Sequence, residues 1–311
     1  MEESPFPYRD ILHRFDYGRV VYIILALFCG EMSVLFVCSE KDLPSVNMKD
    51  HLMAKRDWED VGTIGNDRFL MCGDTAMMIT DDLHIYSDNV DVRAKEAGIT
   101  SDAVMFMSRH SAASGEAALT VHPIGNYGEN KYGGKEGKLV RSAPALMSDA
   151  LRKIIRYSDL PEFKICFEVT HHGPWLEKPT FFIEIGSDEK NWGNIRAADI
   201  LSDVLLNMEP NDYISAIGVA GGHYAPRFTE VAEGFKVNFG HMIPNYHLEG
   251  KDDDSIVRMT RDACEATGTN VVYIHKKSLK KPEERRISEL ISSAGFELIS
   301  SSDLDLINGN Q

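Results

Sequence analysis

Apolar and polar residues follow two different periods along this chain. Short runs rich in aromatic and β-branched residues predict strands. These runs cover residues 33–39, 69–72, 76–80, 103–108, 117–122, 180–185, 213–220, 235–239, 270–275 and 296–300, and a further run begins at Cys166. Apolar residues at helical spacing predict helices over 44–55, 144–157, 187–208 and 253–267, and a basic helix after 276.

Strands that alternate with helices predict an α/β fold with a mixed, mostly parallel sheet and helices on both faces. We expect one domain over 33–303, with 1–32 as an N-terminal extension outside the core and 304–311 as a C-terminal tail. The Gly-rich loop 125–137 is the best candidate for a lobe boundary or a mobile lid. The apolar segment 20–30 is shorter than the ~20 residues of a membrane span and lacks a clear signal-peptide cleavage site.

Histidines recur at the ends of five apolar runs. They are His110, His122, the pair His171–His172, His223 and His241. The carboxyl ends of parallel strands lie along one edge of a sheet, so these residues could converge on one site. A single histidine in such a turn is more often a structural hydrogen-bonding residue, but the recurrence favours a shared site.

Glu168 lies in the apolar run that leads to His171 and His172. A buried carboxylate is costly unless it is paired. In an extended strand Glu168 and His172 would lie about 13 Å apart at ~3.3 Å per residue. The chain must therefore turn at Gly173 before both histidines can face one pocket, and Glu168 is better placed to orient a neighbouring histidine. The alternative is that Glu168 is a satisfied structural residue and both histidines bond backbone in a surface turn.

Histidine and carboxylate without thiolate suit zinc with a water in the open position. The five cysteines are far apart and include no CxxC pair. The motifs HExxH, GxSxG, GxGxxG and the Walker loop are also absent from the sequence. Gly221-Gly222-His223 allows close approach of backbone to a ligand, and its N–H groups could hold an oxyanion, or it could be an ordinary turn.

The net charge of -15 argues against broad, non-specific nucleic-acid binding. It leaves room for a local basic patch. The densest basic cluster is 276–286, which could contact phosphates or could be a solvated helix start.

Eight segments of the chain resemble the D-aminoacyl-tRNA deacylases of the archaeal and plant type. The two longest and most unusual are EVTHHGP at 168–174 and GGHYAPR at 221–227. The others are SRH at 108–110, TVHPIGN at 120–126, GG at 133–134, AP at 143–144, FIEIGS at 182–187, and FGH at 239–241 with YH at 246–247. Residues 1–32 have no counterpart in this resemblance.

The resemblance implies a cytoplasmic esterase that releases a free D-amino acid and tRNA from D-aminoacyl-tRNA, a form of chiral proofreading. It implies a fold similar to those of peptidyl-tRNA hydrolases and nucleoside phosphorylases, and zinc as cofactor. Charged tRNA is then the partner, no membrane or stable protein partner is implied, and a monomer is favoured. The predicted catalytic residues are His171, His172, His223 and Glu168, with Glu184 orienting histidines. The predicted substrate contacts are Gly221, Gly222, Tyr224, Arg227 and Arg109, and the candidate metal ligands are His110, His122, His171, His172 and His223.

Two other classes of protein remain as alternatives. One is a zinc-dependent hydrolase or a phosphorylase of a small molecule, which would act on a free amino-acid ester and ignore tRNA. The other is a non-catalytic tRNA-binding protein, which would lose nothing when the histidines are changed.

Overall fold

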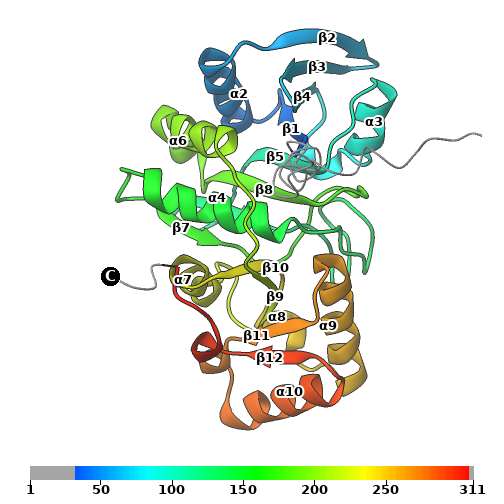
Figure 1. The fold of residues 1–311 in the computed structure, drawn as a ribbon, viewed down its shortest axis with the longest axis vertical. Coiled ribbons are helices and arrows are strands. Elements are labelled where there is room, and N and C mark those ends of the chain that lie inside the picture. The colour runs from blue at the N-terminus through cyan, green and yellow to red at the C-terminus, as the bar shows by residue number, and fades with distance from the viewer. Residues whose placement is uncertain (1–31, 308–311) are drawn as a thin grey trace, which may run out of the picture. The chain divides into compact units, whose positions relative to one another are not determined.

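A computed structural model describes residues 32–307 of the chain (Figure 1). From Ser33 onward the described residues pack as one compact unit. The proposed extension, residues 1–32, lies outside the described residues except for Met32, so it stays a prediction. Residues 304–307 still bond to the fold, because Lys236 N donates to Asp305 O and Ile307 N donates to Gly234 O.

Two sheets form the core. The first has eight strands in the order β2-β3-β4-β1-β5-β8-β6-β7. Its parallel centre is β1 (Val34–Ser39), β4 (Thr75–Thr80), β5 (Ala103–Arg109) and β8 (Thr180–Gly186). One edge adds the antiparallel β2 (Glu59–Ile64) and β3 (Asp67–Cys72). The other edge adds β6 (Ala118–His122), antiparallel to β8, and β7 (Lys164–Phe167), parallel to β6.

The second sheet is parallel throughout. It orders β10 (Val237–Ile243), β9 (Ile214–Val219), β11 (Val271–Ile274) and β12 (Glu297–Ile299). The predicted α/β class with a mixed, mostly parallel arrangement is confirmed. The strands are divided between two sheets where one was expected, because β9 pairs with β10 and β11 and with none of the first sheet's strands.

The helices cover both sheets (Figure 1). The bounds are α2 (Leu43–Lys55), α3 (Val90–Glu96), α4 (Pro144–Tyr157), α5 (Glu189–Trp192), α6 (Ile195–Leu206), α7 (Pro226–Gly234), α8 (Asn245–Leu248), α9 (Asp253–Thr267) and α10 (Lys281–Ser293), with 3-10 turns η1 (His84–Tyr86), η2 (Lys276–Ser278) and η3 (Ser301–Asp303). Helix α4 packs against strands of both sheets. Its predicted apolar face is confirmed, since Leu146, Met147, Ala150, Leu151 and Ile154 are buried.

Some elements differ from the sequence expectation. The helix predicted over 187–208 is interrupted at Gly193, and Asn194 starts α6 by accepting a hydrogen bond from Ala197 N. Strand β2, α3 and α7 were not predicted. Strand β10 runs on to Ile243, which places His241 inside a strand and not at its end. None of the helices within residues 32–307 combines the length and apolarity needed to cross a bilayer.

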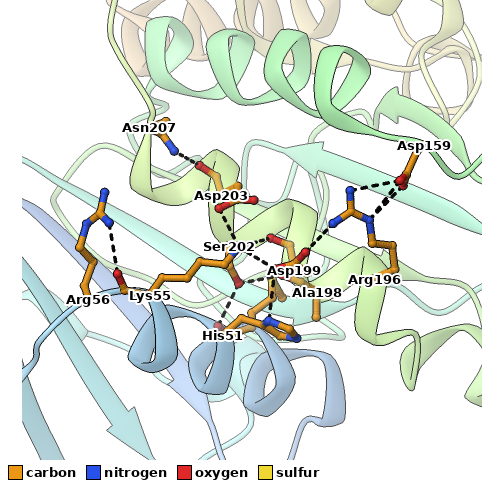
Figure 2. A network of polar contacts seen from close by, with 11 residues as sticks. His51, Lys55, Arg56, Asp159, Arg196, Ala198, Asp199, Ser202, Asp203 and Asn207 are labelled. Carbon is orange, nitrogen blue, oxygen red and sulfur yellow. Dashed lines mark hydrogen bonds and ion pairs between the residues drawn. The ribbon is translucent and has the colours of Figure 1, made fainter.

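A polar network clamps α2 to α6 on the surface of the first sheet (Figure 2). Asp199 on α6 lies 2.6 Å from Lys55 Nζ and 3.3 Å from His51 Nδ1 on α2. Its other oxygen lies 2.5 Å from Arg196 Nη1, and Arg196 also pairs with Asp159. The hydrogen bond from Lys55 lowers the pKa of Asp199 although partial burial opposes this. Asp199 is thus an ionised hub between the two helices.

We expect Asp199→Asn to lower the free energy of unfolding at pH 7 by about 1 kcal/mol, since it removes partly exposed ion pairs. Because the folded pKa is lowered, the contribution is present above the unfolded pKa of about 3.9 and is lost as pH falls through the folded pKa. Denaturant titrations between about pH 5 and about pH 2 should therefore show the variant and the wild type converging. The control is Asp74→Asn, which removes the same charge from an exposed turn. Equal destabilisation by both variants would contradict the clamp.

Candidate functional site

A cavity of about 700 Å³ opens where the end of β5, the segment after β7 and the turn after β9 meet. Four groups singled out from sequence line it: His110, the pair His171–His172, Glu184 and His223. His122 lies behind the wall, fully buried, with its ring centroid 4.2 Å from that of His171 and 5.0 Å from that of His172. The expected convergence of these histidines on one site is present.

The histidines converge through a different strand arrangement from the one expected. Strand β6 is antiparallel to β8, so His122 at its end lies opposite Phe182, whereas His110 follows Arg109, which pairs with Ile185. The two histidines therefore come from opposite directions and not from one edge. Glu184, in the middle of β8, lies between them, with Oε2 3.7 Å from His110 Nδ1 and 3.6 Å from His122 Nε2.

Glu168 is fully buried just beyond the end of β7. Its carboxylate lies 2.8 Å from His223 Nε2, 3.1 Å from His110 Nδ1 and 3.5 Å from His171 Nε2. Glu168 was expected to orient one neighbouring histidine, and in the structure three histidines lie beside it. Burial by itself raises the pKa of Glu168, but the imidazole of His223, 2.8 Å away, and the other surrounding imidazoles lower it below its ordinary value. The group is therefore an anion.

The backbone turns immediately after this carboxylate. Gly173 has the positive φ (100°) that the expected turn requires, and the turn already includes His172, with φ 29°. A Cβ at Gly173 would lie 2.8 Å from Ile124 Cβ, so only glycine fits there. As a result the rings of His171 and His172 face one region, with centroids 4.1 Å apart.

Burial and the neighbouring imidazoles hold the pKa values of His171 and His172 well below the usual range, so both rings are neutral at pH 7. Nδ1 of His171 lies 2.8 Å from Val169 O, which fixes that ring. Among the described residues, several buried polar atoms lack a hydrogen-bond partner. In this site they are His122 Nε2, His172 Nδ1, Glu184 Oε2 and both oxygens of Glu168. Buried polar atoms normally have partners, so this set indicates a bound ligand or ion.

The donor atoms form three groups whose members lie within 4.8 Å of one another. The groups are His122–His171–His172, Glu168–His171–His223 and His110–Glu168–Glu184. Neutral imidazoles and ionised carboxylates are the ligands that zinc takes when no thiolate is present. All five predicted metal ligands belong to at least one of these groups.

Other predicted residues lie elsewhere. His241 is buried inside β10 and bonds to Thr170 Oγ1 and Val140 O, so it is a structural residue, and its inclusion among the converging histidines was wrong. Gly221 N already donates to Asn245 Oδ1, so this N–H is not free for an oxyanion in the present conformation. Arg227 lines a second cavity. Tyr224 reaches the cluster through its hydroxyl, 2.9 Å from His110 Nε2.

The segments that follow β1 and β4 also supply residues that sequence reasoning missed. Asp42 and His84 line the cavity. Asp42 caps α2 and accepts a hydrogen bond from Arg109 N, which holds the predicted substrate residue Arg109 beside the cavity. Burial raises the pKa of Asp42 to about 6 and lowers that of His84 to about 3. Asp42 before Pro44 was a visible capping signal, but nothing local linked either residue to a site.

The Gly-rich loop 125–137 forms part of the same wall, through Gly125, Asn126, Tyr127, Gly128, Glu129, Lys131 and Tyr132. Asn126 Nδ2 donates to Gly133 O, which ties the loop to itself. Tyr132 and Tyr246 are large exposed aromatic residues at this cavity. The mobility of the loop stays a prediction.

Comparison with known proteins places these residues in a family. Residues 97–299 match the family model described as D-aminoacyl-tRNA deacylase. D-aminoacyl-tRNA deacylases of Methanosarcina mazei and Archaeoglobus fulgidus are 31% and 33% identical, over 87% and 86% of this chain and 93% and 96% of their own lengths. A third, from Methanococcoides burtonii, is 35% identical over 89% of this chain, which spans 58% of that relative. A crystal structure of a conserved protein of unknown function superposes with a TM-score of 0.80 at 31% identity, over 89% of this chain and 99% of the other. The chain belongs to the D-aminoacyl-tRNA deacylase family.

Proposed function

We infer that this protein hydrolyses the ester bond of D-aminoacyl-tRNA and releases a free D-amino acid and tRNA. The observation that carries the inference is the buried Glu168–imidazole cluster in the wall of a cavity large enough for an aminoacylated nucleotide. The cluster draws on the segments EVTHHGP and GGHYAPR, which carry the resemblance to this family. The cytoplasmic location and the monomeric state stay predictions.

His223 is the proposed proton acceptor. Its side chain is 39% exposed, while Glu168 is not exposed at all, so His223 can meet both substrate and water. Glu168 lies 2.8 Å from Nε2 of His223, where the carboxylate stabilises the imidazolium that forms when the ring takes a proton. The proton then comes from water to the other ring nitrogen, Nδ1. Glu168 and Glu184 are positioning residues, since both are buried and lie beside the histidines.

The residues present also fit zinc. Three imidazoles with one open position are a known catalytic arrangement, and the group His122–His171–His172 brings three imidazoles together, with His122 Nε2 and His172 Nδ1 lacking a hydrogen-bond partner. When bound, zinc would lower the pKa of a water molecule and polarise the ester carbonyl. Glu184, beside His122, would then fix the orientation of that ligand.

The substrate test compares four substrates. We expect hydrolysis of D-aminoacyl-tRNA, little or no hydrolysis of the L-aminoacyl-tRNA with the same side chain, and only weak activity on the free methyl esters. Release of the amino acid, measured with purified enzyme, checks this. Hydrolysis of the free ester at least as fast as that of the charged tRNA would instead support the small-molecule hydrolase.

We expect His223→Ala to lower kcat/KM for D-aminoacyl-tRNA by about 100-fold or more, the usual contribution of a positioned acid–base group. Its melting curve should remain that of the wild type, because the side chain is partly exposed. The matched control is His51→Ala, a histidine outside both cavities. A fully active His223→Ala variant would remove His223 from the proposed mechanism. A wild type that binds tRNA but releases no amino acid, with tRNA binding unchanged in His223→Ala, would favour the non-catalytic tRNA-binding protein.

The zinc proposal predicts that the purified protein contains zinc and that a chelator removes both the metal and the activity. Metal content measured by elemental analysis should fall in His122→Ala and His172→Ala, because each loses a member of the three-imidazole group. The melting temperature should also fall on chelation, since a ligand that binds only the folded state stabilises it. Metal-free protein with full activity and unchanged melting would overturn the proposal.

A further inference from the structure

A second cavity, of about 570 Å³, lies at the carboxyl ends of β11 and β12 in the second sheet. Its lining includes three formal cations, Arg227, Lys276 and Lys277, against one carboxylate, Glu230. On a chain with a net charge of -15, this concentration of positive charge in a concave surface is unusual. It is also at the edge of a parallel sheet where ligands of α/β proteins bind.

The cations of this cavity differ in how they are used. Arg227 donates its hydrogen bonds within the protein, to Tyr273 Oη, Ser301 Oγ and Glu230. Lys276 and Lys277 are exposed, and neither has a carboxylate within ion-pair distance among the described residues. Further along the same basic run, Lys281 pairs with Glu284, and Arg286 pairs with Asp253 and Glu283. Lys280 and Arg285 are also exposed and have no ion pair among the described residues, but neither lines the cavity. Lys276 and Lys277 are therefore the cations of this run that a ligand in the cavity would meet.

The wall behind these lysines is rigid and polar. Tyr273 Oη lies 2.8 Å from Ser301 Oγ, and Arg227 bonds to both, so the ends of β11 and β12 are tied to α7. Ser300, Ser301 and Ser302 line the cavity with hydroxyl groups. Hydroxyls beside lysines are the groups that proteins use to contact phosphate oxygens.

The two cavities share one segment of chain. His223 lines the first and Arg227 lines the second, so their Cα atoms are at most about 14 Å apart along four residues. His275 also lines the second cavity and lies beside Gly221, two residues before His223, since a Cβ at Gly221 would lie 3.2 Å from its Nδ1. A nucleic-acid chain whose last nucleotide enters the first cavity would bring a preceding backbone phosphate near the second.

We propose that the second cavity is a phosphate subsite, in which Lys276 and Lys277 hold a backbone phosphodiester of the tRNA acceptor end while the ester lies at the His223 cavity. This inference rests on the proposed deacylase function. It assigns a binding site to the tRNA backbone, which is the part of the substrate that the histidine cluster does not contact. It makes these lysines binding residues and not catalytic residues.

The test uses the full chain and two substrates with the same D-amino acid, charged tRNA and aminoacyl-adenosine, which has no phosphate. The double variant Lys276→Ala/Lys277→Ala should raise KM for charged tRNA roughly tenfold at unchanged kcat, with a log–log salt slope reduced by about 1 to 2. Its kinetics on aminoacyl-adenosine should equal those of the wild type. The matched control is Lys95→Ala/Lys251→Ala, which removes the same charge from exposed lysines that line neither cavity.

Three results would overturn the subsite. One is equal KM and salt slope in the double variant and the control. Another is an equal loss on aminoacyl-adenosine, which would mean that the lysines act through the histidine cluster. The third is tight binding of inorganic phosphate to the wild type, abolished in the double variant, with tRNA kinetics unchanged, which would assign the cavity to a free anion. Failure of the deacylase function itself looks different, since the wild type would then hydrolyse neither substrate.

Discussion

The fold depends on keeping one ionised carboxylate, Glu168, away from water among three imidazoles. Burying an isolated charge costs several kcal/mol, so its surroundings must be fixed and complementary. The backbone supplies that fixation. Glu168 N donates to Val121 O in the first sheet, while Val169 N and Thr170 N donate to His223 O and Met242 O next to and within the second. The residues that hold the two sheets together are thus the residues that carry and follow the carboxylate.

The buried polar atoms of the site lower the stability of the fold, while the packing around them holds the site rigid. Each buried polar atom without a hydrogen-bond partner lowers stability by about 1–3 kcal/mol. Several such atoms lie in this one cluster. On the side away from the cavity lie fully buried apolar residues, among them Phe182, whose ring centroid is 5.2 Å from that of His122. The apolar core offsets the cost and prevents the imidazoles from relaxing toward one another, which leaves their nitrogens available to a ligand.

The sequence was informative where the signal is local and misleading where it depends on pairing between distant strands. Apolar runs ending in histidine identified His110, His122, His171 and His223, and helical periodicity identified α4. No local pattern reveals that β6 runs antiparallel to β8, so the shared-edge argument reached the right residues through the wrong geometry. His241 was misassigned because Gly240 looks like the end of a strand. The glycine is there because a Cβ would lie 2.3 Å from Thr267 Cγ2, and β10 continues past it. Asp42 and His84 lie in the segments that follow β1 and β4, far from the histidines in sequence, so only the fold could bring them to the cavity.

The acidic surface bears on how a polyanion is recognised. Non-specific RNA binding grows with the number of phosphates that a protein can neutralise, so a net charge of -15 suppresses it along most of the molecule. Cations that remain unpaired then matter more, because they alone determine where a nucleic acid makes contact. On this chain Lys281 and Arg286 of α10 are paired with Glu284, Glu283 and Asp253, while Lys276 and Lys277, which have no ion pair among the described residues, line a cavity next to the segment that carries His223. Charge pairing, and not charge density, therefore distinguishes a solvated helix from a binding surface here, and this distinction requires the structure.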